Sequence, residues 1–165
     1  MLASVSSLSR RLCLGVSIVA VTFLSACAHK TPKNVPDPKP GGPKRVIVDK
    51  TVQKLSAFEG QRLVIESRVS TGQQGRGTPS GRFRAGYKEA MHYSTLYDNA
   101  PMPWSVQVNG NFFIHGFTSV PDHPASHGCI RLPLTGDNPA KRFFEWVDTG
   151  TPIEITGDWA GKPER

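Results

Sequence analysis

The sequence predicts a mainly β domain with one or two short helices. Short apolar runs recur from residue 46 onward, separated by segments that contain Gly, Asn, Ser or Pro, which is typical of strands and their turns. Asn109-Gly110 lies between two such runs and predicts a β-hairpin with a type I′ turn, in which both central residues have positive φ. Only the segment 138–147 has the spacing of an amphipathic helix.

The elements can be predicted in chain order. Glu59-Gly60 is expected to form a turn between two strands, and Ser70 to Gly81 forms a loop rich in Gly, Ser and Thr. We expect strands at 46–48, 52–58, 62–69, 82–87, 104–108, 111–115 and 151–155.

The helix prediction depends on its two ends. Asn138 can cap the helix, Pro139 suits its first turn and Gly150 can end it. Phe143 and Val147 share one face at i and i+4, so we expect both to be buried.

The first 26 residues predict an export signal rather than part of the fold. Arg10 and Arg11 precede an uncharged run from Leu12 to Leu24, which is short for a membrane span and is followed by small residues. The ending Leu-Ser-Ala-Cys27 resembles the bacterial lipobox, in which the cysteine is lipidated and becomes the new N-terminus. An ordinary signal peptide with an incidental cysteine, or a retained membrane anchor, are the alternatives.

The chain then divides into a tether, a domain and a tail. Residues 27–44 are rich in Pro, Lys and Gly and bury too little apolar surface to fold, so they predict a flexible spacer behind a lipidated Cys27. The domain is expected at 45–157 and a tail at 158–165. Cys13 would be lost with the signal, which leaves Cys129 as a free thiol without a disulfide partner.

The charge indicates an anionic neighbour. The formal net charge is +7 and falls to +5 when Arg10 and Arg11 are removed with the signal. A modest positive balance suits an anionic polymer or a membrane surface, although a solvated surface explains it equally well. The sequence contains no cluster of Lys and Arg interleaved with aromatic residues, so it does not predict nucleic-acid binding.

The chemistry is concentrated between Ile114 and Leu132. Cys129 lies in a Ser-His-Gly-Cys sequence, and His115 ends a predicted strand. A thiol attacks as the thiolate, and a nearby histidine can remove its proton and return it to a leaving amine. Gly128 lets the backbone approach a carbonyl, and the amides of His127, Gly128 and Cys129 could hold an oxyanion.

Two other readings of these residues are open. Cys129 could be a small buried apolar residue, with the histidines in structural roles. His115, His123, His127 and Cys129 could instead bind zinc, but the spacing fits no common structural zinc pattern.

The segment resembles the L,D-transpeptidase catalytic domain, also called the YkuD-type domain. The family pattern is His-Gly, a spacer, then Ser/Thr-His-Gly-Cys, an apolar residue and Arg or Asn; here it reads His115-Gly116 and Ser126 to Leu132. The spacer is shorter than in many members. Further similarity lies at Val69–Gly72, Thr78–Phe83, His92–Ser94, Ala100–Ser105 and Gly150–Pro152. The resemblance implies a YkuD-like β-sandwich of mixed sheets.

The resemblance also implies residue roles. Cys129 would be the acylated nucleophile and His115 the base and acid. His127 would orient the thiol, while Ser126 and Gly128 would shape the loop and the oxyanion site.

A second group of residues would contact substrate. Arg131 would bind a carboxylate of the peptide stem, with a structural ion pair as its alternative. The other residues expected at the cleft are Tyr93, Met102, Trp104 and Gly116.

The implied reaction is acyl transfer in the cell wall. The enzyme would cleave the bond after the third residue of a peptidoglycan tetrapeptide stem and transfer the acyl group from Cys129 to an amine, without a cofactor or metal. Hydrolysis of the same bonds, or an inactive peptidoglycan-binding lipoprotein, are the alternatives. We expect a monomer on the periplasmic side, lipid-anchored through Cys27, with the outer membrane favoured.

Overall fold

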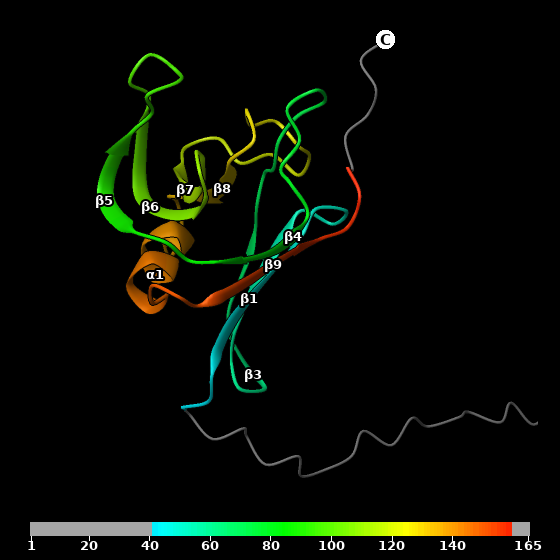
Figure 1. Ribbon diagram of the computed structural model, residues 1–165, viewed down its shortest axis with the longest axis vertical. Coiled ribbons are helices and arrows are strands. Elements are labelled where there is room, and N and C mark those ends of the chain that lie inside the picture. Colours follow the sequence, from blue (N-terminus) through cyan, green and yellow to red (C-terminus); the bar gives the residue numbers. More distant parts are fainter. Residues whose placement is uncertain (1–40, 160–165) are drawn as a thin grey trace, which may run out of the picture. The chain divides into compact units, whose positions relative to one another are not determined.

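The computed structural model describes residues 41–159, which form two mixed sheets and one helix (Figure 1). The predictions for the signal, Cys27 and most of the tether lie outside the described residues, as does the tail beyond 159. The five-stranded sheet has the order β3-β2-β1-β9-β4 and the four-stranded sheet the order β5-β6-β7-β8. The elements are β1 (Lys44–Asp49), β2 (Lys54–Glu59), β3 (Arg62–Arg68), β4 (Gly81–Arg84), β5 (Lys88–Tyr93), β6 (Pro101–Asn109), β7 (Phe112–Phe117), β8 (Ile130–Pro133), α1 (Pro139–Trp146) and β9 (Pro152–Thr156).

Both sheets contain one parallel pair. β1 runs parallel to β9 and antiparallel to β2, and β7 runs parallel to β8 while the other pairs of its sheet are antiparallel. The prediction of a mainly β fold of mixed sheets with a short helix is therefore confirmed.

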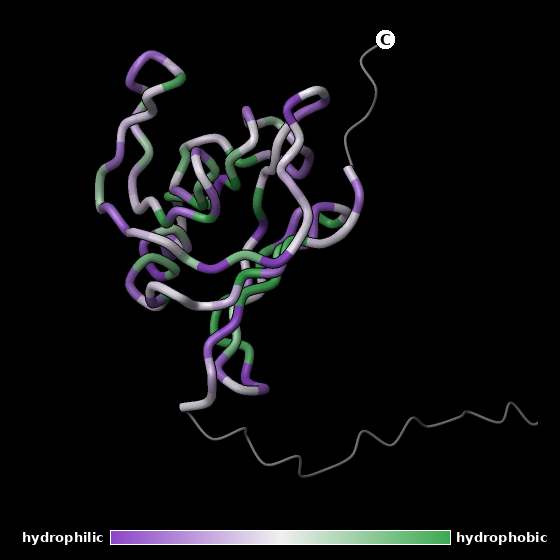
Figure 2. Tube along the Cα trace, viewed as in Figure 1, coloured by the Kyte–Doolittle hydropathy of each residue, from purple (hydrophilic) through white to green (hydrophobic). Residues whose placement is uncertain are grey.

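The core lies between the sheets and is closed by the helix. Val46 and Val48 of β1, Val106 of β6, Ile114 of β7 and Phe143 of α1 belong to one buried cluster. Figure 2 shows apolar residues concentrated where β1 and β9 lie side by side. Phe143 and Val147 have no exposed surface, as predicted.

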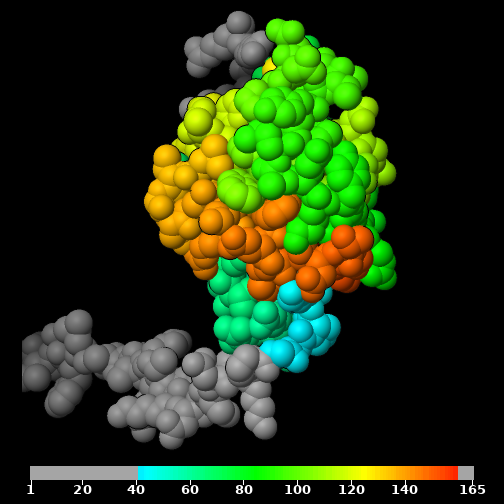
Figure 3. Space-filling model, turned by 90° about the vertical axis from the view of Figure 1, so that its left-hand side faces the viewer, coloured from blue at the N-terminus to red at the C-terminus, as the bar shows by residue number. Residues whose placement is uncertain are grey.

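The helix packs against the sheet that carries β5 to β8. The indole of Trp104 on β6 lies 5.5 Å from the ring of Phe144 on α1, between ring centroids. Figure 3 shows α1 (orange) beside the β5–β6 hairpin (green) on this face.

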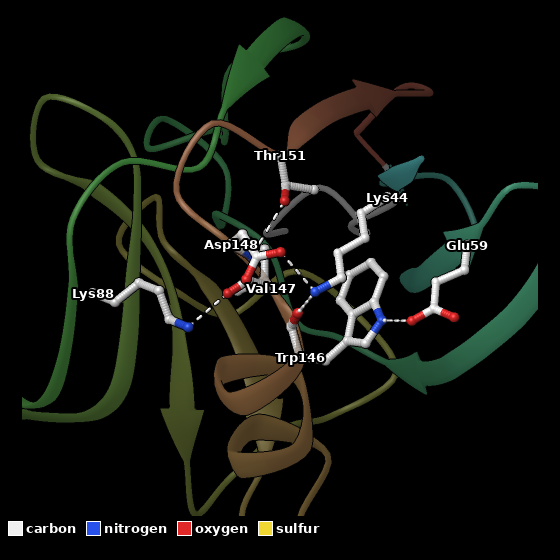
Figure 4. A network of polar contacts seen from close by, with 7 residues as sticks. All are labelled: Lys44, Glu59, Lys88, Trp146, Val147, Asp148 and Thr151. Carbon is white, nitrogen blue, oxygen red and sulfur yellow. Dashed lines mark hydrogen bonds and ion pairs between the residues drawn. The ribbon is translucent and has the colours of Figure 1, made fainter. Parts of the chain in front are cut away.

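Two lysines from different sheets stabilise the end of the helix (Figure 4). Lys44 of β1 donates to the Trp146 carbonyl at 2.6 Å, and Lys88 of β5 donates to the Val147 carbonyl at 2.6 Å. The last turn contains no basic residue, so these cations satisfy carbonyls that would otherwise lack partners. Lys44 also pairs with Asp148 at 2.7 Å, and this bond lowers the pKa of Asp148.

Several local predictions differ from the structure. The hairpin between β6 and β7 is present, but its central residues are Gly110 and Asn111 and only Gly110 has positive φ, so the turn is not type I′. β2 begins at Lys54 because Gln53 adopts a φ of 50°. Gly150 does not end the helix, because Val147 leaves it in an extended conformation.

Other strand limits also differ. β4 ends at Arg84 rather than Tyr87, and the next residue, Ala85, hydrogen-bonds to Thr151 instead. β5 and β8 were not predicted as strands. No helix among the residues described is long and apolar enough to cross a membrane.

Candidate active site

The pairing of β7 with β8 brings the predicted catalytic residues to one face. Ile114 pairs with Ile130 and His115 with Arg131 in parallel register. Ile114 and Ile130 are buried in the core, and side chains alternate along a strand, so His115 and Arg131 point to the opposite face. Cys129 directly precedes β8 and lies on this same face.

That face forms the wall of a pocket of about 200 Å³. Its walls come from β5 to β8, from the loop 94–100 between β5 and β6, and from the loop before β8. The residues that line it include His92, Tyr97, Phe113, His115, Cys129 and Arg131.

His115 is a buried neutral base in this arrangement. Its side chain is buried, with the residue only 5% exposed, and Nδ1 lies 2.9 Å from the carbonyl oxygen of Gly116. A carbonyl only accepts, so Nδ1 carries the hydrogen and Nε2 has a free lone pair. Burial lowers the pKa of His115 to about 4, and the bond to Gly116 offsets only part of this effect.

The thiol of Cys129 is also neutral at rest. Burial raises its pKa, which outweighs the opposing effects of the Phe113 backbone and the charge of Arg131. Its Sγ lies 3.7 Å from the carbonyl oxygen of Asn111. The site therefore holds a neutral thiol and a neutral imidazole, and proton transfer has to accompany attack on a substrate.

Hydrogen bonds inside the loop fix the position of Cys129. Ser126 Oγ accepts from the Gly128 amide at 3.0 Å and donates to the Cys129 carbonyl at 2.5 Å. Thr78 Oγ1 donates to the Gly128 carbonyl at 2.6 Å and accepts from the Gly72 amide at 2.9 Å. Hydrogen bonds from the loop 70–81 thus hold the Ser-His-Gly-Cys loop in place.

One predicted oxyanion donor is already engaged. The amide of Gly128 is bonded to Ser126, so it is not available as the sequence suggested. Gly128 has a φ of 125°, and a Cβ there would lie 2.8 Å from the ring of Phe112, so a glycine is required for conformation and for space. The amides of His127 and Cys129 are the remaining candidates.

His127 lies at the rim of the pocket rather than beside the buried base. Its ring is exposed and stacks on Tyr97 of the loop 94–100 at 4.6 Å, between centroids. The guanidinium of Arg76 lies 6.0 Å from the ring of Tyr97. Partial desolvation lowers the pKa of His127, followed by the charges of Arg76 and Arg131.

Arg131 keeps its charge without an ion pair. Its guanidinium lies 4.1 Å from the ring of Phe117 and donates to the carbonyl of Ala125 at 3.1 Å. Within residues 41–159 no carboxylate forms an ion pair with it, so the alternative of a structural ion pair has no partner there. A cation stacked at a pocket wall suits a substrate carboxylate.

The other residues predicted at the cleft do not all line the pocket. Met102 lines the pocket, whereas Tyr93, Trp104 and Gly116 do not. Tyr93 follows His92 on β5 and points to the other face, where it is 54% exposed. Trp104 has a φ of 57°, which interrupts the alternation of β6, and its ring packs on α1. Gly116 is packed against Leu134.

His123 also lies outside the pocket. Its Nδ1 lies 3.2 Å from Asp122, and its side chain is 61% exposed. Among the described residues, no group of three or more His, Cys, Asp or Glu side chains could hold a metal ion.

Sequence reasoning did not single out the polar pair Glu89 and His92. They come from β5, which was not predicted as a strand, and His92 entered only as part of a similar flap segment. No local pattern marks them, because Glu89 and His92 are three residues apart and do not share the period-two spacing of a strand face.

Comparisons with known proteins agree with this architecture. The sequence matches the L,D-transpeptidase catalytic domain (YkuD) over residues 43–155. The chain belongs to the L,D-transpeptidase catalytic domain family. No curated protein matches it.

Solved structures of the family share the fold. An L,D-transpeptidase from Stackebrandtia nassauensis is 29% identical, with a TM-score of 0.65 over 73% of this chain and 58% of that one. One from Xylanimonas cellulosilytica is 29% identical, with a TM-score of 0.57 over 73% of this chain and 64% of the other. The L,D-transpeptidase LdtMt1, solved in complex with imipenem, is 23% identical, with a TM-score of 0.60 over 68% and 58% of the two chains. This chain thus spans about three fifths of the length of these relatives.

Proposed function

We propose that the protein is a peptidoglycan L,D-transpeptidase that acts through an acyl-enzyme on Cys129. The observation that carries the proposal is the geometry of β7 and β8: Cys129 and His115 share one pocket face, and His115 keeps Nε2 free because Nδ1 is bonded to Gly116. A thiol and a histidine with a free nitrogen on one pocket face support nucleophilic catalysis by the thiol.

The first half-reaction forms a thioester. Nε2 of His115 takes the proton of Cys129 as the sulfur attacks the carbonyl carbon of the third residue of a tetrapeptide stem. The amides of His127 and Cys129 donate to the oxyanion. His115 then gives the proton to the leaving amine of the fourth residue, and the acyl group stays on Cys129.

Charge at the pocket wall orients the donor stem. Arg131 has no ion pair among the residues described and binds a carboxylate of the stem. Met102 supplies apolar contact in the same pocket. The half-buried position of the thiol raises its pKa and keeps it protonated until substrate displaces water from the pocket.

The cell-wall substrate fits an exported protein. We propose that the enzyme works on the periplasmic side, anchored through a lipidated Cys27 by the tether 27–44 and with the outer membrane favoured. The substitution Cys27→Ser should release it from the membrane fraction. An unmodified mature N-terminus at another residue in wild-type cells would contradict this part of the proposal.

Product analysis tests the reaction. Purified enzyme is incubated with a defined disaccharide-tetrapeptide, and products are identified by mass spectrometry. Cross-linked dimers that lack one fourth residue support transpeptidation, whereas tripeptides alone indicate that water is the acceptor. Products unchanged in Cys129→Ala would overturn the role of the thiol.

A further inference from the structure

A second histidine lies in the pocket and is oriented by a carboxylate. His92 of β5 has Nδ1 at 2.6 Å from Oε2 of Glu89, three residues before it on the same strand. A carboxylate accepts, so Nδ1 is the donor and the ring is held in one orientation. Nε2 of His92 has no partner among the described residues. This is the way in which a carboxylate prepares a histidine base.

Ring contacts place His92 on the side of the pocket away from β8. Its ring stacks on Phe113 of β7 at 4.7 Å and meets the edge of Tyr87 at 6.1 Å, between centroids. A hydrogen bond from the Phe113 backbone acts on the Cys129 thiol, so Phe113 lies beside Cys129. Phe113 therefore contacts both polar groups, His92 through its ring and Cys129 through its backbone.

The two ends of the pocket carry opposite charge. Arg131 of β8 supplies a cation and His92 of β5 lines the opposite side, where the carboxylate of Glu89 pairs with His92 from outside the pocket lining. A carboxylate attracts a primary ammonium, and an alkyl ammonium with a pKa near 10 is protonated at neutral pH. Such a group has to lose a proton before it can attack a thioester. His115 is buried, so it is better placed to exchange a proton with the Cys129 sulfur than to take one from an incoming cation.

We propose that Glu89 and His92 form the acceptor subsite, which binds a primary ammonium and removes its proton. The inference rests on the proposed function and makes an amine, rather than water, the acceptor for which the site is built. Glu89 attracts the ammonium, and Nε2 of His92 accepts one proton from it. The resulting imidazolium is stabilised by Glu89.

The second half-reaction forms an amide and releases the thiol. The neutral amine nitrogen forms a bond to the thioester carbonyl carbon, and the carbon–sulfur bond breaks. The nitrogen loses its second proton to Nε2 of His115, which passes it to the Cys129 sulfur. The third hydrogen stays on the new amide, and His92 releases its proton to water.

The test separates acylation from transfer. The variants are His92→Gln and Glu89→Gln, and the matched control is His123→Gln, which changes a histidine that also pairs with a carboxylate but lies outside the pocket. Acylation of Cys129 is followed by intact mass with imipenem. Transfer is followed as the ratio of dimer to tripeptide formed from a disaccharide-tetrapeptide.

We expect both His92→Gln and Glu89→Gln to acylate within about threefold of wild type and to lose transfer by on the order of 10²-fold. Hydroxylamine is largely unprotonated at neutral pH, so its attack on the acyl-enzyme should be unchanged in both variants. His123→Gln should match wild type throughout.

Three results distinguish the possibilities. An unchanged dimer-to-tripeptide ratio with normal acylation overturns the acceptor subsite and leaves the proposed function intact. Equal losses of acylation, transfer and hydroxylamine attack also overturn it, because they mean that the pair only supports the fold. Wild-type enzyme without any adduct on Cys129 overturns the proposed function itself.

Discussion

His115 donates the hydrogen on its Nδ1 to the carbonyl oxygen of Gly116, the next residue in β7, at 2.9 Å. This bond fixes the neutral tautomer and directs chemistry to Nε2. Burial nevertheless dominates the energetics, because it removes the imidazolium from water and lowers the pKa to about 4. The base is thus available across the neutral range.

This pKa predicts a pH-dependent stability. The ordinary pKa of 6.5 applies in the unfolded chain, so between about pH 4 and 6.5 the unfolded state binds more protons than the folded state. The free energy of unfolding should therefore fall as pH decreases through this window, by up to about 3 kcal/mol. Urea unfolding at a series of pH values measures it. His115→Gln should show a shallower decline; parallel curves for the two proteins would refute the burial argument.

Comparison of two histidines tests the assignment of the base. His115→Gln should lower the rate of Cys129 acylation by on the order of 10²–10⁴, because the proposed buried base is lost. His127→Gln should have a smaller effect, since that ring is exposed and stacks on Tyr97. Stopped-flow or mass-based acylation rates decide between them. A severe loss in His127→Gln with a near-silent His115→Gln would reverse the roles.

Covalent labelling tests the nucleophile. Imipenem contains a strained β-lactam carbonyl that a thiolate can open, so we expect it to add to this protein and peptide mapping to locate the adduct on Cys129. Cys129→Ser should lose both adduct and turnover, because a hydroxyl ionises far less readily than a thiol. Near-native thermal unfolding of the variant would show that the fold is retained. An adduct at any other residue would contradict the assignment.

The carboxylate-binding role of Arg131 can be separated from its charge. Arg131→Lys keeps a cation but loses the planar fork and the stacking on Phe117, so KM for the tetrapeptide donor should rise by about tenfold with a smaller change in kcat. Arg131→Met should raise KM further. Steady-state kinetics on the disaccharide-tetrapeptide measures both. Equal KM values in wild type and Arg131→Met would show that the donor carboxylate binds elsewhere.

The sequence predicted the strands whose signals are local. The runs around Glu59-Gly60 and Asn109-Gly110 became the hairpins β2–β3 and β6–β7 because apolar residues flank a turn in each case. β8 was missed because it is a short strand that ends in Pro133 and pairs in parallel with β7. Its existence depends on long-range pairing that no local pattern encodes.

The same distinction applies to the site. Cys129 and Ser126 were predicted from one contiguous motif, and His115 from the His-Gly pair that precedes its spacer. Trp104 was placed at the cleft wrongly, because its positive φ turns the side chain away from the face that simple alternation predicts. His92 was not assigned a role, because only the register of β5 with β6, and the stacking on Phe113, bring it into the pocket.

The loop 70–81 supports the loop that carries Cys129, and a substitution in it should therefore affect acylation. Thr78 links the Gly72 amide to the Gly128 carbonyl, so the position of Gly72 affects the residue beside the nucleophile. A Cβ on Gly72 would lie 2.0 Å from the carbonyl oxygen of Arg76 and 2.7 Å from the Thr78 nitrogen, and both are backbone atoms that cannot rotate away. Gly72→Ala should destabilise the domain by about 1–3 kcal/mol and slow acylation as well.

Gly77→Ala is the matched control in the same loop. A Cβ there has no atom within 4 Å, and Gly77 is not among the glycines with positive φ, so its effect on the free energy of unfolding should lie within about 0.5 kcal/mol of zero. Chemical unfolding and the imipenem acylation rate are measured for both variants. If Gly72→Ala acylates at the wild-type rate despite lower stability, the loop 70–81 supports the fold without positioning Cys129.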